Sequence, residues 1–584
     1  MATEAGEEPR TGVADSTLGR IAYGTGRLLG RALAFVERMP PWLVLGSLLL
    51  LTWGIAAEAA RVALHNGTLY YNAGDGSRYY TTSWSLGNGT MPLSVIGYGY
   101  PLLIAPIAAV AGANMLAAMP AIIAFNLVVL APIALLSVYG IVRTLAGRAY
   151  SYLACLVWVL FPVAVIHYFL AAFHTRYVDN TLPSEVGLTS LGDFPSMVVL
   201  LVAAYFTLRL ASSGRRADAL ATGFAVGLAL VIKPANALFV PAPVLALLVA
   251  RRFSGLAIGA AATLPSLVGL VLWKQRGLGS LPLFQGAGDN RVTLAAVAVT
   301  LVASGHLDVS RYVNLNLHQD WHQLHHNLDS FREYTWSQRM VFFTVGGGLV
   351  GLARRSTVAV VLAATWLVTY FVVEGSTFDM ATGSFFTHFI AAFPAYFLLV
   401  VSVPFLLPFV GRRGAASLSK PATGRFPAVA AAVLGVLSVA GMLFVTVVPT
   451  STASTMAVLP GANLLVPMSQ FPVTATAGKR GVALSWPKQN DHGATIGYTV
   501  MRSPDTGAPD CVRAPSTSAA CVYPATFVGA TSGSGTSFVD HPKPGAWVYR
   551  VAVTAAPYGP KSPRDILVIS SPGRVVVHQE LTTH

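Results

Sequence analysis

Eleven apolar stretches, separated by short polar segments, dominate the first 450 residues of the chain. Most approach the roughly 20 residues that an α-helix needs to cross a bilayer, so the pattern predicts eleven membrane-spanning helices. We expect these helices at about residues 42–62, 117–142, 150–172, 194–211, 217–234, 236–250, 254–273, 340–353, 356–373, 387–410 and 426–448.

A further apolar segment, residues 93–112, is interrupted by Pro101 and Pro106. If it crossed the membrane, every later basic loop would move to the other side, against the rule that basic loops are cytoplasmic. We therefore expect a re-entrant or surface helix with both ends on the outer side. Such backbone is tolerated at membrane depth where protein or a water-filled cavity covers it.

The composition indicates a polytopic membrane protein. Of the 584 residues, 54% are hydrophobic and only 11% are charged, and the mean hydropathy is +0.60. So few charges cannot cover the surface of a soluble domain. The net charge is +14, and arginines recur in the N-terminus and in alternate loops. This predicts a plasma-membrane protein with a cytoplasmic N-terminus and no nucleic-acid partner. We expect no removable signal peptide.

The composition changes after residue 450, where Thr, Ser, Pro and Gly increase. Segments near Trp486, Asp540 and Tyr549 alternate in the period of a β-strand. This tail resembles a fibronectin type III domain over roughly residues 470–575, which implies a β-sandwich on the outer side. Cys511 and Cys521 lie in this region and could form a disulfide, whereas Cys155 is expected to be a small core residue.

These patterns divide the chain into four regions. We expect a cytoplasmic polar N-terminus at 1–40, a helical membrane domain at 41–450, a linker at 451–469 and an extracytoplasmic all-β region at 470–584. The predicted fold class is an α-helical polytopic membrane protein with a C-terminal β-sandwich.

The segment from Leu69 to Pro101 holds the strongest candidate for chemistry. Its single carboxylate, Asp75, stands between two glycines and close to a group of polar and aromatic residues. The group consists of Arg78, Tyr79, Tyr80, Trp84, Tyr98 and Tyr100. A polar turn with interfacial aromatic anchors is the alternative interpretation. The density of aromatic side chains beside one acid favours a substrate site with Asp75 as the general base.

Asp193, in the segment Gly-Asp-Phe-Pro, opens a predicted span. It fits a helix N-cap, and as an ionisable group at membrane depth it also fits a substrate site. The arginines in the predicted outer loops are candidates for binding a phosphate, because guanidinium groups match phosphate oxygens. They are Arg78, Arg176, Arg276 and Arg291, and some of them could instead contact lipid headgroups.

Several histidines lie close together between residues 318 and 326. His318, His322 and His325 would share one face of a helix, with Asp320 or Asp329 nearby. This arrangement permits a divalent metal, but it lacks the His-Glu-x-x-His pattern of zinc hydrolases. We favour a polar helix that lines the substrate cavity or contacts lipid phosphate, with His322 as a binding residue, and a divalent metal is the alternative.

Four features occur in order along the chain: Asp75, Tyr-Pro-Leu-Leu at 100–103, Gly-Asp-Phe-Pro at 192–195, and the segment from Gly223 to Lys233-Pro. Together they resemble the GT-C superfamily of integral-membrane glycosyltransferases, over roughly residues 40–410. The nearest types are protein O-mannosyltransferases, aminoarabinose transferases and bacterial arabinosyl- or mannosyltransferases. The resemblance implies that Asp75 is the base, that the donor is a polyprenyl-phosphate sugar and that the active site faces outward.

In two places the chain can be compared with individual positions of that family. Many relatives carry two adjacent acids in the first outer loop, whereas Gly76 follows Asp75 here. A role that needs a second carboxylate would then fall to another residue. Thr387-His388 stands where relatives often have a basic residue beside an aromatic one, which implies that His388 binds substrate.

The sequence therefore predicts a glycosyltransferase that moves a sugar to an extracytoplasmic glycan, lipid or protein, in contact with membrane lipids. The alternative is a transporter or a lipid or glycolipid flippase with an external accessory domain. Transporters commonly show internal repeats and charges near the centres of their spans, and the sequence shows neither. It also lacks a nucleotide-binding fingerprint, so no soluble nucleotide donor is expected.

Overall fold

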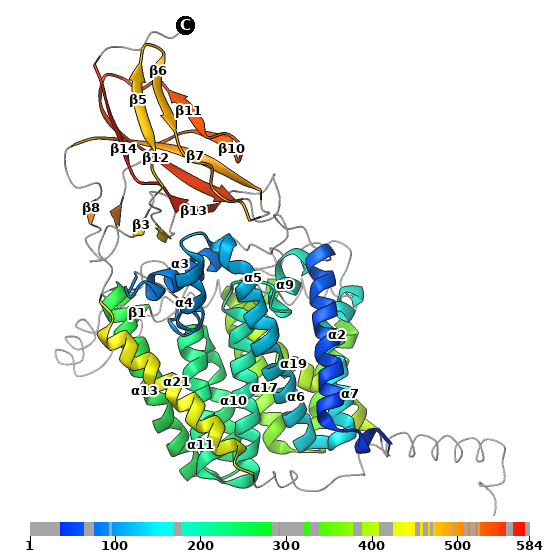
Figure 1. Cartoon of the computed structure of the whole chain (residues 1–584). Helices are drawn as coiled ribbons and strands as arrows, with labels where there is room; N and C mark the ends of the chain where they lie inside the picture. Colours follow the sequence, from blue (N-terminus) through cyan, green and yellow to red (C-terminus); the bar gives the residue numbers. More distant parts are fainter. Residues whose placement is uncertain are drawn as a thin grey trace, which may run out of the picture.

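The structure is a computed structural model in which a helical bundle carries β-sheets at one end (Figure 1). The structure describes residues 35–62, 75–92, 96–168, 174, 177–278, 281–282, 291–292, 321–327, 338–377, 388–407, 424–449, 456–458, 465–467, 471–492, 495–506, 512–513, 521–522, 526–555 and 565–578.

In these residues, six helical segments are long and apolar enough to cross a membrane. They are α2 (Pro41–Val62), the continuous run of α5 (Met115–Phe125), η1 (Asn126–Leu130) and α6 (Ala131–Ala146), α10 (Asp193–Ser213), α13 (Phe253–Leu278), α17 (Thr357–Thr377) and α21 (Phe426–Val447). The expected count of eleven spans is therefore wrong for the part of the chain that the structure describes.

The other five predicted segments are helical but short or interrupted. They contain α7 (Arg148–Ala164), α11 (Arg216–Ile232), α12 (Pro241–Val249), α16 (Gln338–Ala353) and α19 (Phe393–Val400). Tight 3₁₀ turns explain two of these cases: η4 (Pro234–Phe239) precedes α12, while η7 (Ile390–Ala392) and η8 (Val403–Leu406) flank α19. Proline favours such breaks because it lacks a backbone N–H and clashes with the preceding turn. Mean hydropathy does not register these breaks.

The basic turns between helices meet at one end of the bundle, which we call the basic end (residues 39, 143–148, 209–216, 251–252, 354–355, 405–407 and 424–425). Arg148 donates to the carbonyl of Met39. Arg252 Nε lies 3.0 Å from Ala211 O, and Arg354 Nη1 lies 2.7 Å from Leu406 O. This grouping agrees with the alternation of basic loops in the sequence.

The opposite end, called the α3 end, holds α3 (Asp75–Gly87) and α4 (Gly99–Ala111) (Figure 1). With 13 residues each, both helices are too short to span a bilayer. The segment before α4 crosses the end of α11, and a Cβ atom on Gly97 would stand 2.0 Å from Val231 O. Only glycine permits this approach. The arrangement agrees with the prediction that 93–112 does not cross the membrane.

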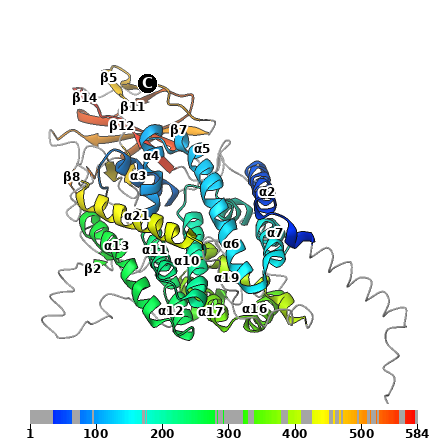
Figure 2. The same ribbon diagram turned by 60° about the horizontal axis from the view of Figure 1, so that its bottom comes forward.

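The C-terminal region lies beyond the α3 end and contains two sheets that pack on each other (Figures 1 and 2). One has the order β11-β6-β5, and the other has the order β10-β7-β12-β13 with β14 also paired to β12. Their strands are β5 (Thr474–Gly478), β6 (Gly481–Ser485), β7 (Ile496–Pro504), β10 (Thr526–Ser532), β11 (Ser537–Asp540), β12 (Gly545–Ala555), β13 (Asp565–Ile569) and β14 (Gly573–Val577).

Six shorter strands complete the described β-structure. They are β1 (Leu281–Pro282), β2 (Arg291–Val292), β3 (Met456–Val458), β4 (Leu465–Pro467), β8 (Val512–Arg513) and β9 (Cys521–Val522). The last four form one sheet in the order β4-β3-β9-β8.

The sheets β11-β6-β5 and β10-β7-β12-β13 share an apolar core and one polar cluster. The rings of Trp486 and Tyr498 lie 5.5 Å apart between the sheets. Asp540 on β11 accepts hydrogen bonds from Arg502 on β7 and Tyr549 on β12, both at 2.6 Å. One carboxylate therefore links the three-stranded sheet to two neighbouring strands of the other.

The cysteine predictions have two outcomes. Cys155 is free and buried in α7, as expected of a core residue. Cys511 lies outside the described residues, as does the side chain of Cys521, so the expected disulfide stays a prediction.

Candidate functional site

The first predicted acid, Asp75, is the first residue of α3; its side chain lies outside the described part of the structure. The backbone at the start of α3 packs inside the protein: Gly76 is buried, and its carbonyl accepts from the Ser190 hydroxyl at 3.4 Å. Ser190 belongs to the segment that leads into α10. The start of α3 therefore rests on the segment that ends at Asp193.

A second contact holds α3 against the same segment. The ring of Tyr79 lies over Gly192, where an added Cβ atom would stand 2.5 Å from the tyrosine hydroxyl oxygen. A larger residue at position 192 would displace the ring. This close approach, together with the contact between Ser190 and Gly76, brings the two predicted acidic segments to one place at the α3 end.

Asp193 forms an ion pair that the sequence did not predict. Its Oδ1 atom lies 2.6 Å from Nζ of Lys233, and both side chains are largely buried. Lys233 is the residue at which α11 ends, 40 positions along the chain. The N-cap interpretation of Asp193 is wrong, because Gly192 is the cap and Asp193 is the first helical residue.

Glu374 and His388 complete an ionisable group that we call the acid–lysine cluster, defined as Asp193, Lys233, Glu374 and His388. Glu374 lies in the last turn of α17 and is 5% exposed. Its Oε2 atom lies 3.7 Å from Nδ1 of His388. Asp193 and Lys233 both act electrostatically on Glu374 and His388. His388 was predicted as a site residue, whereas Glu374 was not.

A buried amide holds the helices that carry this cluster. Asn236, in η4, donates to Ser196 Oγ on α10 and to Ala229 O on α11, each at 2.7 Å. Its Oδ1 atom accepts from the Tyr370 hydroxyl on α17 at 2.8 Å. One side chain thus joins α10, α11 and α17 directly beside Lys233, and this network fixes the geometry of the ion pair.

The predicted substrate-binding tyrosines all lie in helix interfaces. The Tyr80 hydroxyl donates to Gly112 O at 2.5 Å, and the Tyr100 hydroxyl donates to Asn126 Oδ1 at 3.4 Å. The Tyr79 and Tyr100 rings meet edge to face with centroids 5.8 Å apart. Tyr98 packs on Trp273 at the same separation. In this structure the four rings hold α3 and α4 against α5, α10 and α13.

The candidate phosphate-binding arginines differ in their surroundings. Arg78 is half-buried on α3, whereas Arg176 and the side chain of Arg291 lie outside the described residues. The Arg276 guanidinium donates to the carbonyls of Val445, Thr446 and Val448, where α21 ends. Arg276 therefore caps a helix, and its donors are engaged with backbone rather than directed at a ligand.

The histidine-rich segment is partly described as a helix over 321–327. His322, His325 and His326 are exposed on it, while the Asn327 amide donates to Gly375 O, next to Glu374. His318, Asp320 and Asp329 lie outside the described residues. Within the ranges given above, no group of three or more His, Cys, Asp or Glu residues could hold a metal ion.

Comparison with known proteins gives no relative: the chain matches no protein-family model, no curated protein and no solved structure.

Proposed function

We propose that the chain is a membrane glycosyltransferase of the GT-C type, which moves a sugar from a polyprenyl-phosphate donor to a glycan, lipid or protein acceptor. The observation that carries this proposal is the convergence of the start of α3 with the acid–lysine cluster. Contacts of Ser190 with Gly76 and of Gly192 with Tyr79 bring Asp75 and Asp193 to the same end of an apolar bundle.

The reaction requires a base and a positive environment for the leaving phosphate. In the proposed step, the Asp75 carboxylate takes the proton of the acceptor hydroxyl. The acceptor oxygen then bonds to the anomeric carbon while the bond from that carbon to the phosphate oxygen breaks. Polyprenyl phosphate leaves with the electron pair. Arg78 and Arg176 are proposed to bind its phosphate, with His322 at the rim.

The acid–lysine cluster contains the second carboxylate that is missing beside Asp75. Gly76 stands where GT-C relatives often carry a second acid, and Asp193 or Glu374 can supply that carboxylate from another helix. Lys233 places a cation 2.6 Å from the Asp193 carboxylate inside the bundle. We propose that Asp193 orients the acceptor and that His388 also binds substrate.

The placement of the described charges favours a transferase over a transporter. Asp193 begins α10, Lys233 caps α11 and Glu374 lies in the last turn of α17, while the buried pair of Arg209 and Asp218 stands at the basic end. Transporters more often carry such groups near the membrane midplane. Chemistry at one surface is the simpler account of this distribution.

We propose that the C-terminal sheets form a fibronectin type III-like sandwich. The strand orders β11-β6-β5 and β10-β7-β12-β13 and the shared core of Trp486 and Tyr549 support this assignment. The proposed orientation has the basic end in the cytoplasm and the α3 end outside. The sandwich would then stand beside the site, where it binds wall glycan or orients the acceptor without taking part in catalysis.

The test is sugar transfer by purified Asp75→Asn protein, with labelled polyprenyl-phosphate mannose and polyprenyl-phosphate arabinose as donors. Loss of a general base typically lowers the rate by about 10²–10⁴. Donor binding should persist, because the phosphate is held by other residues. Glu58→Gln is the matched control, since it changes an acid to an amide at the exposed end of α2.

Near-normal turnover by a folded Asp75→Asn protein would show that Asp75 is not the general base. Turnover of neither donor by the wild-type protein, combined with movement of labelled lipid between the leaflets of reconstituted vesicles, would replace the transferase with a flippase.

A further inference from the structure

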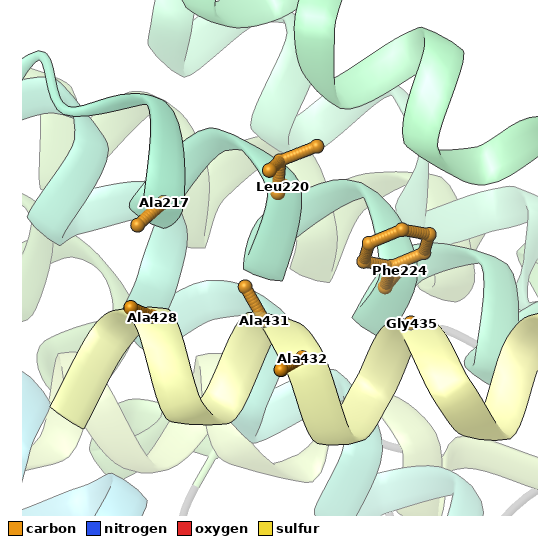
Figure 3. A pocket seen from close by; sticks show the side chains of 7 residues that line it. All are labelled: Ala217, Leu220, Phe224, Ala428, Ala431, Ala432 and Gly435. Carbon is orange, nitrogen blue, oxygen red and sulfur yellow. The ribbon is translucent and has the colours of Figure 1, made fainter. Parts of the chain in front are cut away.

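An apolar groove of about 380 Å³ lies between α11 and α21 (Figure 3). Its lining residues are Ala217, Leu220, Phe224, Ala428, Ala431, Ala432 and Gly435. Its volume falls in the range of roughly 300–1,000 Å³ that is usual for small-molecule sites. The groove opens on the outer surface of the bundle, where Leu220, Ala428 and Ala432 are exposed.

Small residues create this groove. At one end, Gly435 lets α21 approach α11 closely, because an added Cβ atom would stand 2.9 Å from the Phe224 ring. Toward the basic end, alanines on both helices leave the space between them unfilled (Figure 3). A bundle in a membrane surrounds such a groove with lipid, so an acyl chain is the apolar group at hand to fill it.

The end of the groove near Ala217 and Ala428 is positively charged. Arg216 is the first residue of α11 and Arg425 is the cap residue of α21, and both are exposed. The two helices run in the same direction, so both positive dipole ends meet here (Figure 3). Asp218, two positions after Arg216, is buried and pairs with Arg209 at 2.9 Å, so it is not available to pair with these arginines.

We propose that this groove binds one anionic phospholipid. An acyl chain would fill the groove between α11 and α21, and the phosphate would lie between Arg216 and Arg425. Guanidinium groups match phosphate oxygens, and each basic residue near an anionic lipid contributes about fivefold to binding. The site stands at the basic end, away from the acid–lysine cluster, and does not depend on the proposed transferase activity.

The test is lipid binding to the purified full-length chain, measured by native mass spectrometry with dioleoylphosphatidylglycerol and dioleoylphosphatidylcholine. The wild-type protein should prefer the anionic lipid. The Arg216→Gln/Arg425→Gln variant should bind that lipid about 25-fold more weakly and the neutral lipid unchanged. Ala432→Phe, which fills the groove, should weaken both lipids, with Ala428→Phe as the substitute if that variant does not fold.

Arg251→Gln is the matched control, because Arg251 is an exposed arginine at the basic end that does not line the groove. It should keep the wild-type preference. Equal binding of the two lipids to the wild-type protein would overturn the proposal, as would complete competition by inorganic phosphate. A groove-filling variant that changes the oligomeric state and leaves lipid binding intact would identify the groove as an interface between copies of the chain.

Discussion

The Nζ atom of Lys233 lies 2.6 Å from Oδ1 of Asp193, and this contact ties the end of α11 to the start of α10. Both side chains are largely removed from solvent. A charge in such a place is retained only with a close partner, because burial of an unpaired ion costs several kcal/mol. Asn236, beside the pair, joins the same two helices to each other and to α17. The pair is therefore a structural requirement of the α3 end as well as part of the candidate site.

Replacement of Lys233 by Met should destabilise the protein strongly. It leaves the Asp193 carboxylate buried without its cation, in the field of Glu374, and such a change costs about 3–5 kcal/mol. The double variant Asp193→Leu/Lys233→Met should lose less, because no charge is stranded. Thermal unfolding of the detergent-purified protein measures both. Arg61→Met, which breaks the exposed pair with Glu58, should change little. A Lys233→Met protein as stable as Arg61→Met would contradict the structural role of the pair.

Arg276→Gln and Arg78→Gln should have different effects. Arg276 caps α21, so its loss should lower the melting temperature and leave the affinity for donor nearly unchanged. Arg78 lies on α3 close to Asp75, so its loss should raise the KM for donor with little change in melting. Paired melting curves and donor titrations distinguish the two. Weakened donor binding in a stable Arg276→Gln protein would show that Arg276 binds the donor.

The stability of the protein should fall as pH rises through the titration of Glu185. Burial raises the pKa of this carboxyl from 4.5 to about 7, and the Tyr177 hydroxyl donates to it. The folded state thus holds the proton more tightly than the unfolded state. The resulting stability is fully present below about pH 4.5 and is lost as pH rises toward about 7.

Glu185→Gln removes this titration, so its melting temperature should decline less than that of the wild type between about pH 5 and pH 8. Glu58→Gln, at an exposed position, should keep the wild-type slope. If the Glu185→Gln and wild-type curves run parallel, the assignment of the pH dependence to Glu185 is wrong.

The C-terminal region from residue 471 to 578 should fold when expressed alone, with a cooperative β-type transition followed by Trp486 fluorescence. Asp540→Ala should destabilise this fragment by about 2–4 kcal/mol, since two charge-assisted hydrogen bonds between the sheets are lost. Asp505→Ala breaks the more exposed pair with Arg574 and should cost at most about 1 kcal/mol. A disordered wild-type fragment would show that the sheets need the bundle.

The sequence by itself determined where the helices lie and which turns group together. Where the structure describes them, the eleven predicted segments are helical, because an apolar run in a membrane must satisfy its backbone hydrogen bonds internally. The basic turns meet at one end, and the strand period located the tail. Hydropathy did not determine which helices are long enough to span a membrane. That depends on tight turns such as η4, which change the backbone without changing the mean hydropathy.

The tertiary structure alone decided how the candidate site is built. Lys233 reaches Asp193 across 40 residues, and Glu374 and His388 join them from elements still later in the chain. A pairing of this kind depends on how helices pack, which no local pattern encodes. The same packing places the tyrosines that we expected at a substrate surface in contacts between helices. It also places the Arg276 guanidinium on the last carbonyls of α21. Residue type gave each group its chemistry, but its partners depend on which helix ends the fold brings together.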